Sequence, residues 1–163
     1  MTGTDRPRLF LLLLTWVVLT IIGGAVGAQS ISVVSNLSFG NVFPNVPKVV
    51  SKYTAGAAAE FHVSGTAGSE VQITFLFLPT YLNQSGFTLS VLFSNTDCAM
   101  DSSATPNQSN PGYDDLNPWQ PITYRLGMNG LTIWLGATAI PNIGQKPGSY
   151  SGPIQVRVQY TGN

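Results

Sequence analysis

The chain has 163 residues, with seven lysines and arginines against seven aspartates and glutamates, so its formal net charge is zero. Only 9% of the residues are charged, and this composition provides no basic patch for binding nucleic acid or an anionic membrane. We therefore expect neither of these partners.

The N-terminus has the features of a signal peptide. Arg6 and Arg8 form a short basic start, residues 9–22 are an apolar run, and small residues follow. This pattern predicts a signal peptide over residues 1–28, cleaved before Gln29, and therefore a secreted protein. An uncleaved membrane anchor is the alternative, because the leader is about long enough to span a bilayer.

The rest of the chain, residues 29–163, alternates between apolar and polar side chains with the period of half-buried strands. The alternating runs lie at residues 31–39, 59–63, 71–77, 87–93, 122–126, 131–137 and 154–160. Gly- and Asn-containing turns separate them, and no helical period occurs. We therefore predict one all-β domain, an antiparallel β-sandwich of about seven strands with an immunoglobulin-like or jelly-roll-like fold.

The longest interruption, residues 95–121, is polar and proline-rich, and we expect it to be a functional or mobile loop outside the core. It contains the only carboxylate cluster, Asp97, Asp101, Asp114 and Asp115. Calcium binds several such oxygen ligands, so these four residues are weak calcium candidates. The simpler interpretation is that they keep the loop solvated, because their spacing matches no EF-hand.

Three aromatic residues are candidates for a ligand site or an interface. Tyr113 and Trp119 belong to the loop, and Trp134 has the outward parity of its strand. Exposed rings can stack on sugars, so these residues with Asp114 and Asp115 could form the site of a secreted adhesin or carbohydrate-binding module. Alternatively, Trp119 folds back as a lid over one end of the sandwich.

Catalytic groups are scarce, and we expect no enzyme, no cofactor and no small-molecule substrate. His62 is the one histidine and has outward parity, which favours a surface residue over a general base. Cys98 has no partner cysteine, and we expect a buried thiol near Phe93 and Met100 rather than an intermolecular bridge. Metal-ligand spacings and nucleotide-binding or hydrolase motifs are missing.

Four sequence blocks together resemble one known family. They are "LSFGNVFPN" at residues 37–45, "AAEFHVSGTAGSEVQITF" at 58–75, "GLTIWLGATAI" at 130–140 and "GSYSGPIQVRVQY" at 148–160. In this order they resemble the bacterial family DUF4402. That family looks related to pilin-like fimbrial subunits and to spore-coat-U-like secreted domains. The resemblance implies an exported, pilin-like β-sandwich at the bacterial cell surface, without catalysis.

The resemblance also implies a structural role, in a pilus, filament or coat whose subunits join by β-strand addition. Its partners would be further copies of the chain and a periplasmic chaperone and usher. Ile31 and Val33 are the donor candidates, although residues 29–36 must serve as either the donor or the first strand. The acceptor edge, or a chaperone-binding strand, would contain the apolar residues of the last run: Ile154, Val156, Val158 and Tyr160.

Overall fold

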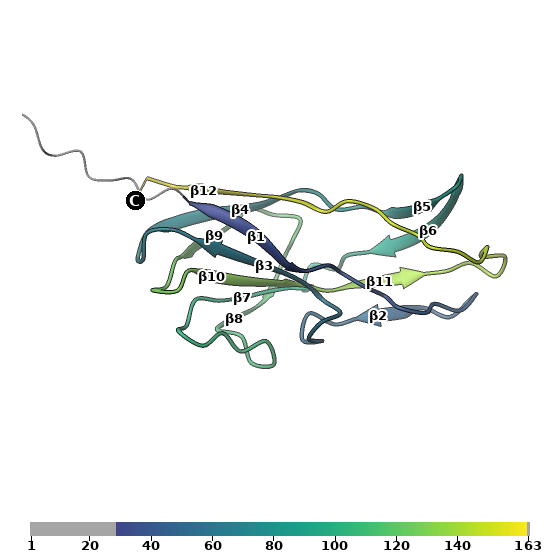
Figure 1. Ribbon diagram of the computed structural model, residues 1–163, viewed down its shortest axis with the longest axis horizontal. Helices are drawn as coiled ribbons and strands as arrows, with labels where there is room; N and C mark the ends of the chain where they lie inside the picture. Colours follow the sequence, from purple (N-terminus) through teal and green to yellow (C-terminus); the bar gives the residue numbers. More distant parts are fainter. Residues whose placement is uncertain (1–28, 163) are drawn as a thin grey trace, which may run out of the picture.

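The computed structural model describes residues 29–162, which form an elongated stack of β-strands (Figure 1). These residues contain no helix, and so none that could cross a membrane. Both ends of the described chain lie at the same end of the molecule, which we call the terminal end; the opposite one is the far end (Figure 1). The predicted signal peptide and its cleavage lie outside the described residues.

The described residues form twelve strands, whereas the sequence predicts about seven. In chain order they are β1 (Ser30–Ser35), β2 (Lys48–Val50), β3 (Ala59–Ser64), β4 (Glu70–Phe77), β5 (Tyr81–Gln84), β6 (Phe87–Leu92), β7 (Cys98–Asp101), β8 (Tyr113–Leu116), β9 (Ile122–Arg125), β10 (Leu131–Leu135), β11 (Ala137–Ile140) and β12 (Gln155–Tyr160). The strand pairs are antiparallel, so the prediction of an all-β antiparallel sandwich is confirmed and the predicted number of strands is too low.

Two sheets form the layers of the sandwich at the terminal end. The five-stranded sheet has the order β1-β3-β10-β7-β8, and the three-stranded sheet has the order β12-β4-β9. The ring of Phe61 in β3 meets that of Phe75 in β4 edge-on, with centroids 6.3 Å apart, so the two sheets face each other. Between them, Val63, Ile73 and Ile133 have no exposed surface and form part of one continuous core.

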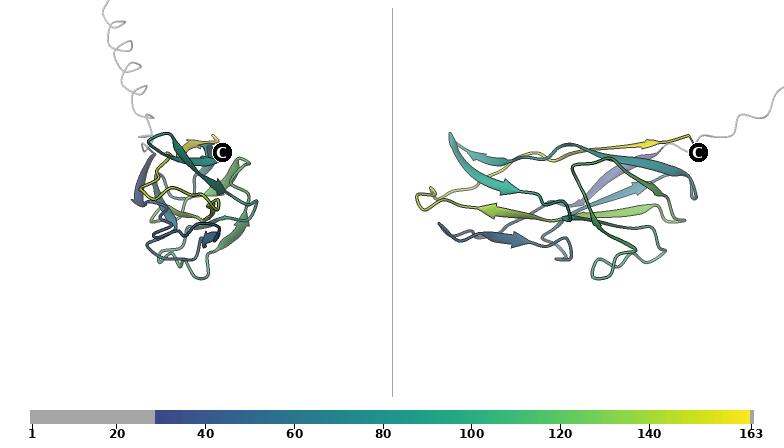
Figure 2. Two further views of the ribbon diagram at one scale, coloured as in Figure 1. Left: turned by 90° about the vertical axis from the view of Figure 1, so that its right-hand side faces the viewer. Right: turned by 180° about the vertical axis from the view of Figure 1, so that it is seen from behind.

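The four-stranded sheet, β2-β11-β6-β5, forms the far end (Figures 1 and 2). It continues strands from both layers, because β10 leads through Gly136 into β11 and β4 leads through residues 78–80 into β5. Gly136 is required at this joint. A Cβ atom there would lie 2.6 Å from the carbonyl oxygen of Val50 and 2.7 Å from the backbone nitrogen of Lys52.

The prediction that residues 95–121 form a loop outside the core is wrong in part. β7 and β8 lie within this stretch, and β7 pairs with β10 in the five-stranded sheet. All four residues of β7 are buried, on both of its faces. A strand buried on both faces shows no alternation of apolar and polar residues, which explains why the period-2 pattern misses it.

The two layers meet differently along their two sides. On one side, the rings of Tyr113 in β8 and Tyr124 in β9 are in contact, with centroids 4.9 Å apart. On the other side, the edge strands β1 and β12 approach each other at the terminal end, where Gln29 Nε2 donates a 2.7 Å hydrogen bond to the Val158 carbonyl. Toward the far end, the segments that adjoin these two strands leave a groove between them.

Candidate functional site

The groove is a large hollow, with a volume of about 1030 Å³. One wall is the segment of residues 36–44, which follows β1, and the other is the segment of residues 145–154, which precedes β12. The floor consists of core residues from three strands and one connection: Phe61, Leu82, Leu89, Val91 and Phe93. The groove therefore leads from the surface to the hydrophobic core.

Proline and glycine explain why neither wall, as described, forms a strand. Residues 40–47 include Gly40, whose φ is 59°, and two prolines, and residues 145–154 include two more prolines and Gly148 with φ 147°. Proline cannot donate to a ladder, and positive φ angles interrupt one. The first wall is held by the Ser38 N–H, which donates to the Ala57 carbonyl at 2.8 Å, and the second by a single bridge to β5.

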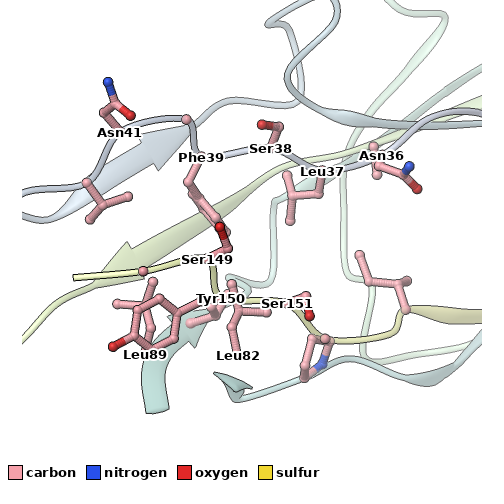
Figure 3. A pocket seen from close by; sticks show the side chains of 18 of the residues that line it. Asn36, Leu37, Ser38, Phe39, Asn41, Leu82, Leu89, Ser149, Tyr150 and Ser151 are labelled. Carbon is pink, nitrogen blue, oxygen red and sulfur yellow. The ribbon is translucent and has the colours of Figure 1, made fainter. Parts of the chain in front are cut away.

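The lining of the groove is apolar or small and polar. Within the described chain, Lys146 is its only charged side chain. Leu37 and Phe39 reach in from one wall, and Tyr150 reaches in from the other (Figure 3). The Tyr150 hydroxyl donates a 2.8 Å hydrogen bond to the Lys146 carbonyl. The apolar part of this lining suits an occupant with apolar side chains.

The donor candidates Ile31 and Val33 lie in β1, which pairs with β3 as an edge strand of the five-stranded sheet. Both side chains have inward parity: Ile31 lies opposite Val63, and Val33 lies opposite Phe61. Ile31 is half-buried against the core, whereas Val33 is 61% exposed at the mouth of the groove. Of the two roles left open by the sequence, this structure places residues 30–35 in that of the first strand.

The acceptor candidates lie along the other side of the same opening. Ile154 lines the groove, and Val156, Val158 and Tyr160 follow in β12 with their half-buried side chains packed against the core. The Tyr160 hydroxyl accepts a 2.8 Å hydrogen bond from the Thr66 N–H. The structure therefore brings all six predicted assembly residues to the side of the sandwich where β1 and β12 meet.

The expectation that Trp134 is exposed is wrong. Its parity is outward, but only 3% of its surface is exposed. Its neighbours on this face, Thr132 and Ala99, are buried too, because the connections before β3 and after β7 fold over the five-stranded sheet. A 2.7 Å hydrogen bond from Gln108 Nε2 to the Lys52 carbonyl ties these two connections together. Strand parity alone could not reveal this cover.

The other two aromatic candidates, Trp119 and Tyr113, are half-exposed, and each packs against a different aromatic residue. Trp119 stands edge-on to Phe93, with ring centroids 6.3 Å apart, and its Nε1 donates a 2.9 Å hydrogen bond to the Phe93 carbonyl. This arrangement agrees with the lid alternative. Tyr113 packs against Tyr124 instead. Tyr113, Trp119 and Trp134 do not form one binding face.

The four aspartates do not assemble into a calcium site. Among the described residues, no group of three or more histidine, cysteine or acidic side chains could hold a metal ion. Asp97 accepts the Ser94 N–H at 2.6 Å, and Asp101 accepts two loop N–H groups. These bonds shape the loop.

Asp114 and Asp115 are engaged by a lysine that the sequence did not single out. Lys52 is 5% exposed, and its Nζ lies 2.6 Å from Asp114 Oδ1 and 2.7 Å from Asp115 Oδ1. Burial by itself would lower the pKa of Lys52, but the bonds to the two carboxylates raise it overall. Burial by itself would raise the pKa of Asp114, but the bonds from Lys52 and Tyr53 lower it overall. This ion-pair cluster fastens β8 to the connection between β2 and β3.

Cys98 is a buried thiol, as predicted. It has no exposed surface and belongs to the same core cluster as Phe93 and Met100. Burial raises its pKa to about 12, so the thiolate needed for nucleophilic chemistry does not form near neutral pH. His62 has outward parity and is partly exposed.

The sequence reasoning missed the groove walls themselves. The signal available was the clustering of Pro and Gly in residues 40–47 and 147–153, next to runs that otherwise alternate like strands. Such clusters indicate where a sheet edge stops pairing. That the two clusters face each other depends on the fold.

Comparison with known families supports the sequence resemblance. A family described as a domain of unknown function, DUF4402, matches residues 21–160. Comparison with curated proteins found no match. The matched range covers the four blocks noted above, both groove walls and all twelve strands. The chain therefore belongs to the DUF4402 family.

Proposed function

We propose that this protein is an exported structural subunit of a surface filament, pilus or coat, and that a β-strand of a second copy adds at the groove. The observation that carries this proposal is the groove itself. As described, its first wall pairs with no strand, its second wall has one bridge to β5, and its floor is the core. An added strand would pair with a wall and place alternate side chains over Phe61 and Val91. The wall of residues 36–44 spans about 30 Å when extended, enough for a strand of eight or nine residues.

The edge strands differ in charge, and this difference favours one of them as the donor strand. Among the described strands at sheet edges, β2, β8, β9 and β12 each carry a charged residue, whereas β1 and β5 carry none. β5 is bridged to the second wall and contributes Leu82 to the floor, so it cannot also be a donor. β1, with Ile31 and Val33 alternating with serines, matches a lining whose only described charged side chain is Lys146.

The release of β1 would break only one strand pair. β1 pairs only with β3, a bulge at Val34 interrupts the ladder, and none of its side chains is fully buried. Release would uncover the edge of β3 and lengthen the groove toward the terminal end. The β1 strand of another copy could then form the same hydrogen bonds with β3 that the released strand lost. The exchange would therefore cost little free energy.

The position of the groove favours an open-ended polymer. β1 begins at the terminal end (Figure 1). The groove extends from Val33 to residues of the four-stranded sheet. Donor and acceptor are therefore two different surfaces, β1 itself and the groove that begins beside it. A contact between two different surfaces propagates from copy to copy unless its rotation closes a ring.

Paired substitutions on the two faces of β1 test this proposal. Replacing Ile31 and Val33 with Asp puts charges on the inward face, whereas replacing Ser30 and Ser32 with Asp puts them on the outward face as a matched control. We expect electron microscopy and sedimentation to detect polymers of the wild type and of the control, and none of the inward variant. A labelled peptide of residues 29–36 should bind the inward variant, while a scrambled peptide should not. A wild type that is strictly monomeric, with no polymer on the producing cells, would contradict the proposal.

The alternative is a secreted adhesin or carbohydrate-binding module. Its support is the half-exposed state of Tyr113 and Trp119. It is weakened by the burial of Trp134 and by the ion pairs that engage Asp114 and Asp115. Glycan-array binding that is lost in Trp119→Ala would favour this alternative, and an array without any binding would count against it.

A further inference from the structure

The outward faces of the three sheets differ in what covers them. The central part of the outward face of the five-stranded sheet is buried under other parts of the chain, as Thr132 and Trp134 show. The outward face of the three-stranded sheet is polar and charged, with Arg157 beside Thr74 and Glu70 beside Arg125. Only the four-stranded sheet, within the described chain, leaves an apolar outward face uncovered.

This outward face of the four-stranded sheet, which we call the far-end face, is built from two cross-strand rows. In one row Thr138 of β11 lies between Val49 of β2 and Leu92 of β6. In the next row Ser90 of β6 lies between Ile140 of β11 and Tyr81 of β5. The four apolar members of these rows are all exposed.

No charged residue points outward from the far-end face in the part of the chain that the structure describes. Its remaining members, Thr88 and Asn83, form a third row and are also uncharged. Adjacent apolar residues exposed on one sheet face are typical of an interaction surface, whereas isolated ones are not. The far-end face therefore suits a partner whose contacting surface is apolar and carries little charge.

We propose that the far-end face binds the same face of a second copy of this chain. An uncharged surface can meet its own copy in any orientation without like-charge repulsion. The contact is isologous, so it pairs two copies and then closes. It is independent of strand addition at the groove: strand addition would extend a polymer, and the far-end contact would join two polymers side by side.

Two matched exposed leucines test the contact. Leu92 is 53% exposed on the far-end face, and Leu76 is 52% exposed on the outward face of the three-stranded sheet. We expect sedimentation of the purified protein to show, besides polymers joined at the groove, a dimer that dissociates on dilution. Leu92→Lys should weaken it by at least about tenfold, because it buries a charge at an apolar contact, and Leu76→Lys should leave it unchanged.

The same measurement in the background of Ile31→Asp and Val33→Asp separates this contact from strand addition. That background removes the proposed donor strand and leaves the far-end face intact. A dimer that persists there and is lost on adding Leu92→Lys supports the far-end contact whether or not the wild type polymerises. A dimer that disappears in that background belongs to β1 and overturns the inference.

Cross-linking provides an independent readout of the same face. Thr138 and Gln72 are both half-buried residues on central strands, and the native thiol of Cys98 is buried. Thr138→Cys should give covalent dimers with a short bismaleimide, and Gln72→Cys should not. Equal cross-linking at the two positions would overturn the inference. So would a protein that stays monomeric and instead sediments with phospholipid vesicles in a Leu92-dependent manner.

Discussion

Val33 and Phe61 are direct partners in the β1–β3 pair, yet Val33 exposes 61% of its surface and Phe61 only 4%. Partners that point to the same side of a sheet normally share one environment. The difference arises because Phe61 lies over the core, whereas Val33 lies at the edge, where the opposite layer no longer covers it. The pair therefore marks the point at which the closed sandwich opens into the groove.

The first prediction follows from this asymmetry. Val33→Ser should change the free energy of unfolding by no more than about 0.5 kcal/mol, because little buried surface is lost. Phe61→Ala should lower it by about 3–5 kcal/mol, because it leaves a cavity in the core. Guanidinium denaturation followed by tryptophan fluorescence measures both values. Similar losses in the two variants would show that Val33 is packed as deeply as its partner.

The second prediction concerns the dependence of stability on pH. The lowered pKa of Asp114 means that its contribution to stability is complete above the ordinary carboxyl value of 3.8 and is lost as the pH falls through the lowered value. The raised pKa of Lys52 means that its contribution is complete below 10.5 and is lost as the pH rises through the raised value. The wild type should therefore be most stable between these limits.

Lys52→Met should reduce the loss of stability at both low and high pH. Lys48→Met, on the exposed edge strand β2, is the control and should leave the dependence of stability on pH unchanged. The difference at pH 7 should be modest, about 1 kcal/mol or less, because the Asp114 side chain is 37% exposed and solvent screens the pair. Urea denaturation at pH 3, 7 and 11 measures the profile. Some loss at low pH should remain, because Asp101 also has a lowered pKa: burial raises it, but loop N–H groups lower it more. Superimposable profiles for Lys52→Met and the wild type would contradict this prediction.

The third prediction concerns the single thiol. Cys98 should not react with iodoacetamide at pH 8 in the folded protein, because it is buried and its pKa is raised to about 12. It should react stoichiometrically in guanidinium, as mass spectrometry can show. Ser109→Cys, at an exposed position, is the control that should also react in the folded state. Rapid labelling of folded wild type would mean that the core near β7 opens readily.

The fourth prediction concerns the joint between β10 and β11. Gly136→Ala should lower the free energy of unfolding by about 1–3 kcal/mol, because its new methyl group meets backbone atoms that cannot move aside easily. Gly144→Ala is the control, since the nearest atom to its Cβ would be 3.6 Å away. It should change stability by no more than about 0.5 kcal/mol. A melting temperature unchanged by Gly136→Ala would show that residues 50–52 can shift.

The alternating strands could be predicted from the sequence because each has one buried and one solvated face. Phe61 and Val63 of β3, and Val71 and Ile73 of β4, point inward as their parity predicts. The predicted strand of residues 131–137 is divided at Gly136, where the chain passes from one sheet to another. Local periodicity carries no information about that transfer.

The candidate site could be predicted only in part. The apolar faces of β1 and β12 were visible as alternation, but the groove depends on two irregular segments that come together only in the folded chain. Likewise, the parity of Trp134 was correct and its exposure was not, because segments remote in sequence cover its face. Tertiary contacts of this kind leave no period in the sequence.

The alignment of the strands with the long axis has a mechanical consequence (Figure 2). In a head-to-tail polymer, tension would enter each subunit at the groove and leave through its donated β1. The backbone hydrogen bonds of the added strand would then be loaded in parallel along their ladder, so many must fail together. Such a fibre would resist pulling far better than peeling, and its weakest direction would be sideways.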